Sequence, residues 1–152
     1  MLRIGNMADC PAVYRLICDM EQTKLSYDVF SQIYEKQLGY KEYVCLIFEQ
    51  EQQVVGVLNL RLEWQLHHAA LIAEIMEFAV DPHLRSKGIG KKLFAYAAQL
   101  AKEAGCVQIE VACNRLRTET HRFYLREGMQ KYHYKFTKSL QGEEIKENAI
   151  GR

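Results

Sequence analysis

Hydrophobic and polar positions follow two spacings along this chain, one typical of helices and one typical of strands. Helical spacing occurs in residues 9–20, 26–38, 89–104 and 118–127. Alternating or short continuous apolar runs occur in residues 2–5, 43–48, 54–62, 72–80, 107–112 and 132–136. The predicted order is strand, two helices, three strands, helix, strand, helix, strand. In so short a chain, this order predicts an α/β (α+β) fold with a central mixed sheet and helices on both faces.

Residues with known end preferences predict where the first two helices begin and where the second one ends. Asp9 suits an N-cap because Pro11 follows just inside the helix start. Ser26 suits the N-cap of the second helix, and Gly39 suits its end. We expect the second helix to bury one apolar stripe, formed by Phe30, Ile33, Tyr34 and Leu38.

Length and composition indicate one globular domain over residues 1–140, followed by a polar tail, 141–152, that we expect to be frayed. The net charge of +1 favours neither nucleic acid nor a membrane surface as a partner. No apolar run approaches the roughly 20 residues of a membrane span, and the N-terminus lacks the apolar core of a signal peptide. The five cysteines form no C-x-x-C pair, so we expect reduced thiols and a cytoplasmic protein.

A basic glycine loop, R-S-K-G-I-G at residues 85–90, connects the predicted central strand to the third helix. Glycine lets successive backbone N–H groups converge, and a helix N-terminus attracts anions, so the loop suits a pyrophosphate. A magnesium-binding P-loop would need a Ser or Thr after its lysine, and a dinucleotide loop a third small residue where Leu93 stands. The alternative is a glycine-rich turn with incidental lysines.

The loop, in the form R-x-x-G-x-G after A-V-D-P, resembles the acetyl-coenzyme A loop of the GNAT superfamily of N-acetyltransferases. The string F-Y-L-R-E-G-M at 123–129 and the predicted element order resemble the same superfamily, over about residues 1–140. The resemblance implies the GNAT fold, with acetyl-coenzyme A (acetyl-CoA) as co-substrate. It implies coenzyme contacts from Phe78, Ala79 and Val80 along the pantetheine arm, from Arg85, Ser86, Lys87, Gly88, Ile89, Gly90 and Lys91 at the pyrophosphate, and from Asn114, which is three residues further from Tyr124 than is usual.

The same resemblance assigns two catalytic roles. Tyr124 takes the place of the acid that protonates the leaving thiolate, and Glu74 that of a general base acting directly or through water. Tyr124 could instead pack against Phe123 in the core, and Glu74 could pair with a nearby Arg or Lys. The period of two along a strand predicts that Glu74 and Glu77 point to opposite faces of the sheet.

Three further strings, L-H-H-A-A-L-I-A-E-I at 66–75, T-H-R-F-Y-L-R-E-G at 120–128 and Y-K-F-T-K-S-L at 134–140, look like the aminoalkylphosphonate N-acetyltransferases. That resemblance implies a small aminophosphonate as the acceptor and stimulation by a divalent metal. Cationic or multi-donor side chains suit a phosphonate dianion, and a carboxylate suits its amine. The predicted acceptor-binding residues are His68, Glu77, Arg117 and His121. A metal held by His67 or His68 with Glu74 is conceivable, but no ligand spacing predicts a metal site.

Several alternatives stay open on the sequence alone. The acceptor could be a polyamine, an aminoglycoside, an amino acid or a protein amine, and the enzyme could be a homodimer by resemblance to its superfamily. A non-catalytic acyl-CoA sensor on the same fold is the alternative from another class. A P-loop nucleotide enzyme is a third idea that the missing Ser or Thr disfavours.

Overall fold

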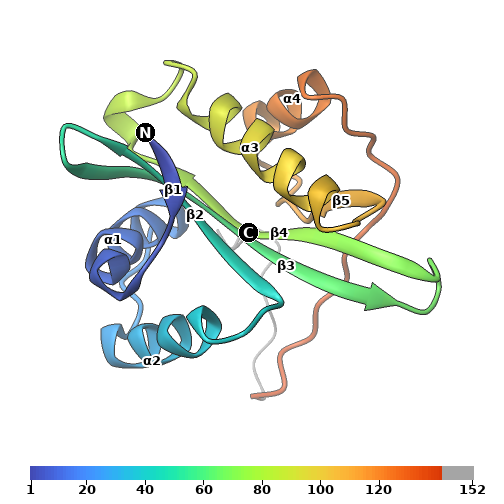
Figure 1. Ribbon diagram of the computed structural model, residues 1–152, viewed down its shortest axis with the longest axis horizontal. Coiled ribbons are helices and arrows are strands. Elements are labelled where there is room, and N and C mark those ends of the chain that lie inside the picture. The colour runs from blue at the N-terminus through green and yellow to red at the C-terminus, as the bar shows by residue number, and fades with distance from the viewer. Residues whose placement is uncertain (142–152) are drawn as a thin grey trace. The chain divides into compact units, whose positions relative to one another are not determined.

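The computed structural model describes residues 1–141 and contains a five-stranded sheet and four helices in that part of the chain (Figure 1). The strands are β1 (Leu2–Ile4), β2 (Tyr43–Gln50), β3 (Gln53–Gln65), β4 (Ala70–Val80) and β5 (Gln108–Val111). The α-helices are α1 (Cys10–Glu21), α2 (Tyr27–Leu38), α3 (Ile89–Glu103) and α4 (Thr118–Arg126). Two short 3₁₀ helices, η1 (Met7–Asp9) and η2 (Pro82–Leu84), precede α1 and α3.

The sheet has the order β1-β2-β3-β4-β5, antiparallel except for the parallel pair β4–β5. The mixed sheet with helices on both faces is therefore confirmed. Two compact units divide the chain, Met1–Val111 with the whole sheet and α1 to α3, and the residues from Ala112 onward with α4. The predicted tail, residues 141–152, lies outside the described residues apart from Gln141.

Within the first unit, α1 and α2 cover one face of the sheet and α3 covers the other (Figure 1). Val13 and Leu16 of α1 belong to a buried cluster with Ile47 and Val57 of the sheet, and this cluster includes Ala79 of β4. On the opposite face, Gly56 of β3 lies directly beneath the buried Ile89 and Leu93 side chains of α3. Burial of these two apolar layers is the main stabilising term for the unit.

The predicted sixth strand, residues 132–136, is wrong. None of these residues is in a strand or paired to one in the described part of the chain, and the rings of Tyr132, Tyr134 and Phe136 are exposed. Alternation shows only that one side of a segment is apolar, whereas a strand also needs a neighbour for its backbone hydrogen bonds. The predicted stripe of α2 is wrong at one position, because Ile33 is half exposed while Tyr34 is buried.

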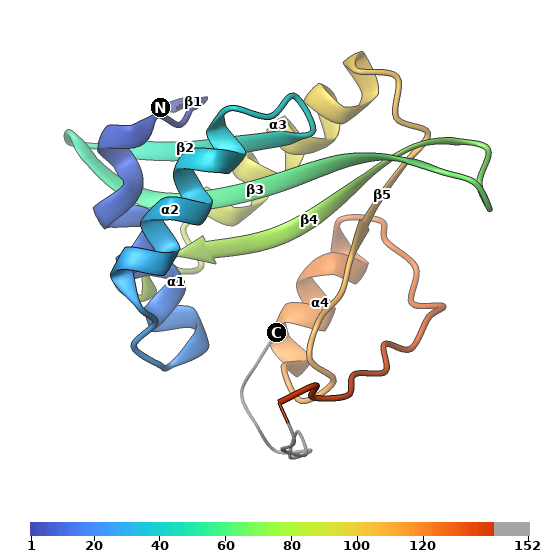
Figure 2. The same cartoon turned by 90° about the horizontal axis from the view of Figure 1, so that it is seen from below.

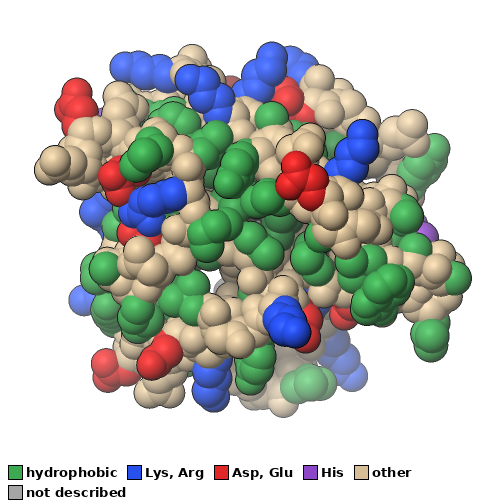
Figure 3. Space-filling view, viewed as in Figure 1, with side chains coloured by type: hydrophobic (Ala, Val, Ile, Leu, Met, Phe, Trp, Pro, Cys, Tyr) green, Lys and Arg blue, Asp and Glu red, His purple; other side chains and the backbone are tan. Residues whose placement is uncertain are grey.

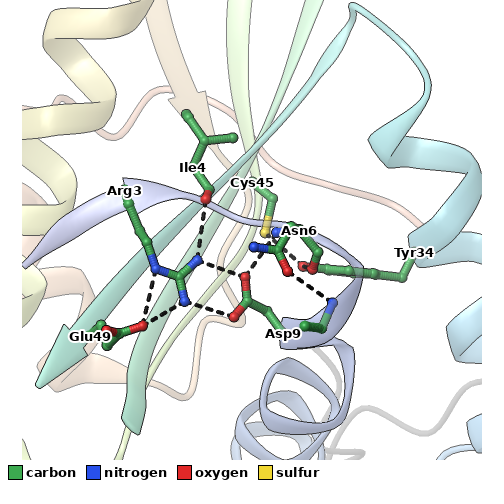
Figure 4. Close-up of polar contacts among 8 residues, drawn as sticks. Arg3, Ile4, Asn6, Asp9, Tyr34, Cys45 and Glu49 are labelled. Carbon is green, nitrogen blue, oxygen red and sulfur yellow. Dashed lines mark hydrogen bonds and ion pairs between the residues drawn. The ribbon is translucent and has the colours of Figure 1, made fainter. Parts of the chain in front are cut away.

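The two predicted N-caps have different outcomes. Ser26 caps α2 as expected, since its hydroxyl accepts from the Val29 N–H at 3.3 Å. Asp9 occupies the N-cap position of α1 but makes no side-chain capping bond. Its carboxylate instead accepts two parallel hydrogen bonds from Arg3, each 2.8 Å long, and one from the Asn6 N–H (Figure 4).

Arg3 of β1 links the start of α1 to strand β2. Its Nε and Nη2 also donate to Oε1 of Glu49 on β2, at 3.1 and 2.7 Å, so that one guanidinium holds two carboxylates (Figure 4). Beside this network, the Tyr34 hydroxyl donates to the Asn6 carbonyl at 3.0 Å. Burial raises the pKa of the neighbouring Cys45 thiol to about 11, so this cysteine stays protonated at neutral pH. All five cysteines are free thiols, as the sequence predicts.

Candidate active site

The two candidate carboxylates of β4 lie on the same face of the sheet. Glu77 pairs with Asn59 and Glu74 with Arg61, and a β-bulge between these pairs leaves Met76 without a partner on β3. Asn59 and Arg61 are two residues apart on β3 and so share a face, as do their cross-strand partners. The predicted placement on opposite faces is wrong, because the extra residue of a bulge reverses the alternation of the strand.

This shared face carries a polar row on the side that α2 covers. The Asn59 amide donates to Glu77 Oε1 at 2.9 Å and to Gln37 Oε1 of α2 at 3.0 Å. One step along the strands, Arg61 Nη2 donates to Glu74 Oε1 at 2.8 Å. A small cavity of about 10 Å³ adjoins the row and is lined by Tyr34, Gln37, Leu38, Tyr43, Cys45 and Asn59.

Glu74 is therefore ion-paired, as one sequence alternative expected, and its partner is Arg61. The side chains of Glu74 and Arg61 remain 28% and 31% exposed, so both are accessible from solvent. Sequence reasoning did not single out Arg61 or Asn59. The only sequence signal for their role was their position in β3, the strand before β4. Which residues of β3 lie opposite the glutamates depends on the bulge.

The glycine loop lies between β4 and α3 and is fixed to the sheet at its start. The Asp81 N–H donates to the Val55 carbonyl at 2.8 Å, and the Asp81 carboxylate accepts from the His83 N–H at 2.9 Å. Ser86 and Gly88 then adopt left-handed backbone angles, with φ of 64° and 85°. At Gly88 this conformation carries no Cβ strain, and it turns the chain directly into α3.

The first turn of α3 has no side-chain cap, so its N–H groups are available to a ligand. Arg85, Lys87 and Lys91 are exposed around it, whereas Ile89 is buried in the core and contributes only its backbone. Lysine and arginine side chains lie over this segment at the upper left of Figure 3. The loop can hold an anionic group by its backbone dipoles and its cations together.

Next to the loop, one edge of β4 is open. Pairing of β4 with β5 covers only Ile72–Ile75 against Gln108–Val111. Beyond Ile75, the residues Phe78, Ala79 and Val80 pair with β3 on one side and with no strand of the described chain on the other. A strand edge that no neighbouring strand covers is a place where an extended ligand can add to a sheet.

His67 and His68 lie in the turn between β3 and β4, at the far tip of the hairpin (Figure 2). Both side chains are exposed, and His68 Nδ1 contacts Gln65 Oε1 at 2.7 Å. The two histidines do not alternate across a strand, because β3 ends before them and β4 begins after them. Four strand residues, or about 13 Å, separate the start of β4 at Ala70 from Glu74, so the structure does not bring His68 to the carboxylates.

The remaining candidates belong to the second unit, where they surround the start of α4. Asn114 forms a turn in which its side chain accepts from the Leu116 N–H at 2.8 Å. The Asn114 carbonyl contacts His121 Nε2 at 2.8 Å and accepts from the Arg117 N–H at 3.0 Å. The structure therefore brings Asn114, Arg117 and His121 together. The contact of His121 with the Asn114 carbonyl fastens the turn to α4.

Tyr124 is buried on α4, and its ring makes an edge contact with Phe123 at 5.5 Å between centroids. This ring contact is the packing that one sequence alternative foresaw, and the catalytic role of Tyr124 stays a prediction. Burial, with a smaller contribution from Cys113, raises the pKa of the Tyr124 phenol, while Arg117 opposes the shift. The phenol is therefore fully protonated at neutral pH and retains a proton to donate.

Two further features bear on ligands and location. No group of three or more His, Cys, Asp or Glu side chains suited to a metal ion occurs among residues 1–141. In the same part of the chain, no helix is both long enough and apolar enough to cross a membrane. The structure thus contains no preformed metal site made by such a group within the described residues.

The chain is similar to proteins of known sequence and structure. A curated relative, the aminoalkylphosphonate N-acetyltransferase of Salmonella typhimurium, is 37% identical over 139 residues, or 91% of this chain and 90% of the relative. Among solved structures, a transcriptional regulator from Bacillus halodurans has a TM-score of 0.84 at 18% identity, covering 92% of this chain and 99% of that one. Glucosamine-6-phosphate N-acetyltransferase from Arabidopsis thaliana has a TM-score of 0.78 at 20% identity, covering 92% and 97%.

The family assignment follows from the sequence match, and the two solved structures support the fold alone. The acetyltransferase (GNAT) family matches residues 11–129, which include α1, the sheet from β2 onward, the glycine loop and α4. Acetyl-CoA is the co-substrate of that family. The fold expected from the resemblance is confirmed. The chain is an acetyltransferase and belongs to the acetyltransferase (GNAT) family.

Proposed function

We propose that this enzyme transfers the acetyl group of acetyl-CoA to the primary amine of a small aminoalkylphosphonate. The observation that carries the proposal is the 37% identity, over most of both chains, to a relative named for that activity. The polar row on β3 and β4 supports it, because carboxylates and a guanidinium side by side suit an acceptor with an ammonium and an anionic group.

The coenzyme would occupy the open edge of β4 and the glycine loop. Phe78, Ala79 and Val80 would pair backbone groups with the pantetheine arm, on the side of β4 where no strand of the described chain pairs with them. The pyrophosphate would accept hydrogen bonds from amides of residues 85–91, with Arg85, Ser86, Lys87 and Lys91 around it and Gly88, Ile89 and Gly90 in the backbone turn. Asn114, a residue of the second unit, is the last of the residues proposed to contact the coenzyme.

The proposed reaction is a direct transfer. Glu74, or a water that it holds, takes a proton from the acceptor ammonium, and the freed amine forms a C–N bond with the acetyl carbon as the C–S bond breaks. Tyr124 donates its proton to the departing thiolate, and the second proton that the nitrogen loses on becoming an amide returns to the phenol, directly or through water. Glu77 would contact the acceptor ammonium from the same face of the sheet as Glu74.

Three further residues are proposed to contact the acceptor, namely Arg117, His121 and His68. Their positions in the structure support this role to different degrees. Arg117 and His121 lie together at the start of α4, although His121 already spends one ring nitrogen on Asn114. His68, at the tip of the β3–β4 hairpin, would need the acceptor to reach that turn. Stimulation by a divalent metal stays part of the proposal, with no protein ligands assigned to the metal.

The decisive experiment measures release of coenzyme A thiol from acetyl-CoA with 1-aminoethylphosphonate, alanine or spermidine as the acceptor. Each reaction is run with a divalent metal and with a chelator, and an enzyme-only blank corrects for the five cysteines. We expect turnover with the phosphonate and little with the other amines. Turnover only on another amine would discard the phosphonate, and binding of acetyl-CoA without turnover on any amine would indicate an acyl-CoA sensor.

We propose in addition a reducing, cytoplasmic location and a homodimeric state. Five free thiols, several with a pKa raised by burial, suit a reducing compartment. The homodimer rests on resemblance to the superfamily. Sedimentation equilibrium of the purified chain at micromolar concentration would give the mass of the assembly.

A further inference from the structure

Arg61 of β3 uses only a small part of its hydrogen-bonding capacity. Nη2 donates to Glu74 Oε1 at 2.8 Å and lies 3.5 Å from Glu63 Oε2. Nε is buried and has no hydrogen-bond partner in the described part of the chain. A guanidinium has five N–H donors in a planar fork, so residues 1–141 leave most of the fork unused.

The contrast with Arg3 shows that this arrangement is not the one the fold uses for a structural arginine. Arg3 bonds through all three of its nitrogens, with two parallel hydrogen bonds to Asp9 and two to Glu49. Arg61 meets Glu74 through one nitrogen and leaves a buried N–H unsatisfied, which is unfavourable. An arginine placed only to hold Glu74 would be expected to bond in parallel, as Arg3 does.

The surroundings of Arg61 match both charges of an aminophosphonate. Glu63, Glu74 and Glu77 lie on the same face as Arg61, two of them within 3.5 Å of its Nη2. The carboxylates suit an ammonium, and the free part of the guanidinium fork suits a tetrahedral dianion. Arg61 and Glu74 are directly opposite each other on paired strands, so one small zwitterion can reach both.

His68 is a weaker candidate for the same anion. It lies in the hairpin turn, beyond the start of β4, and its Nδ1 already contacts Gln65. An anion held there would place the amine of a small acceptor far from Glu74, whereas an anion on Arg61 places it beside Glu74.

We propose that Arg61 binds the phosphonate of the acceptor, exchanging its contact with Glu74 for the substrate. The exchange frees Glu74 to receive the ammonium proton, so a correctly charged substrate itself releases the base. This inference rests on the proposed function and makes Arg61 the residue that selects acceptors with an anionic group. An acceptor without the anion leaves Arg61 on Glu74 and is acetylated slowly.

The test compares 1-aminoethylphosphonate with isopropylamine, in which a methyl group replaces the phosphonate. For Arg61→Gln we expect the ratio of kcat/KM for phosphonate to that for isopropylamine to fall at least tenfold, on the order of a lost charge-assisted bidentate contact. Arg61→Lys should give an intermediate ratio, because lysine keeps the charge but not the fork. The KM for acetyl-CoA should not change in either variant.

The exposed Lys102 on α3 provides a control, since Lys102→Gln also removes one positive charge and should leave the ratio unchanged. An unchanged ratio in folded Arg61→Gln would overturn the inference, as would equal losses with both acceptors. If Arg61→Gln does not fold by circular dichroism, an unchanged ratio in Arg61→Lys overturns it instead. Absence of phosphonate turnover in the wild type would overturn the proposed function and this inference with it.

Discussion

Gly56 of β3 lies beneath the first residues of α3, where the glycine loop ends, and Gly56→Ala tests whether this packing positions the loop. A Cβ at this position would lie 2.8 Å from Leu93 Cδ1 and 3.2 Å from Ile89 Cγ2. Both neighbours are buried in α3, and Ile89 is the first residue of that helix. The added methyl therefore presses against the start of α3, where the glycine loop ends.

The expected magnitude follows from two opposing terms. Forcing a methyl group into a packed core costs about 1–3 kcal/mol, and replacing glycine in the unfolded chain returns about 0.4–1 kcal/mol. We expect the free energy of unfolding to fall by about 1–2 kcal/mol. A shift of the first helical turn would also misalign loop amides worth about 1 kcal/mol each, raising the Kd for coenzyme A roughly three- to tenfold.

Urea unfolding followed by circular dichroism measures the first effect, and calorimetric titration with coenzyme A measures the second. Gly39→Ala is the matched control, because Gly39 has an ordinary φ of −86° and a Cβ there would lie 3.4 Å from the Lys36 carbonyl oxygen. The control should change stability by less than about 0.5 kcal/mol. If Gly56→Ala is as stable as the wild type and binds coenzyme A equally well, the proposed link between sheet packing and the loop is refuted.

Three further predictions concern the ion network, the acid and the loop. The hydrogen bonds from Arg3 hold the pKa of Asp9 below its value in the unfolded chain, which is about 3.9. The ionised Asp9 therefore adds to the free energy of unfolding above that pH, and this contribution is lost as the pH falls through the pKa of the folded state. Asp9→Asn should therefore lower the free energy of unfolding by about 2 kcal/mol at pH 7, with little difference from the wild type near pH 2, and equal differences in urea titrations at both pH values would contradict this. Tyr124→Phe should lower kcat about 100-fold and leave the Kd for coenzyme A within about threefold, and unchanged turnover would remove Tyr124 from the mechanism. Gly88→Val should cost about 1–3 kcal/mol of backbone strain at a φ of 85° and weaken coenzyme A binding at least about tenfold by calorimetry, whereas wild-type affinity would place the pyrophosphate elsewhere.

Local signals in the sequence predict most of the fold. The cap at Ser26, the end of α2 at Gly39 and the turn through Gly88 into α3 are each set by a few adjacent residues, and the structure confirms them. Asp9 shows the limit of such signals, because a partner six residues earlier in the chain takes its carboxylate away from the helix. The segment 132–136 shows the same limit for strands, whose existence depends on a distant partner.

The candidate site depends more strongly on distant partners. Sequence motifs indicate Glu74, Tyr124 and the loop, but the neighbours of Glu74 follow from the register of β3 against β4. That register includes a bulge with no glycine or proline to signal it, in the run I-M-E at 75–77. A register shift of one residue moves every later side chain to the other face, so one unsignalled residue decides which groups meet.

The bulge at Met76 explains why the proposed acceptor and coenzyme sites lie side by side in the first unit. It places Glu77 on the same face as Glu74 and Arg61, which assembles the polar row. Pairing between β4 and β5 ends at Ile75, the residue just before the bulge, so no strand of the described chain pairs with Phe78 to Val80 on that side. An unbroken strand would send Glu77 to the face that α3 covers, where the Asn59 contact could not form. One inserted residue thus lies between the proposed acceptor-binding face and the proposed coenzyme-binding edge.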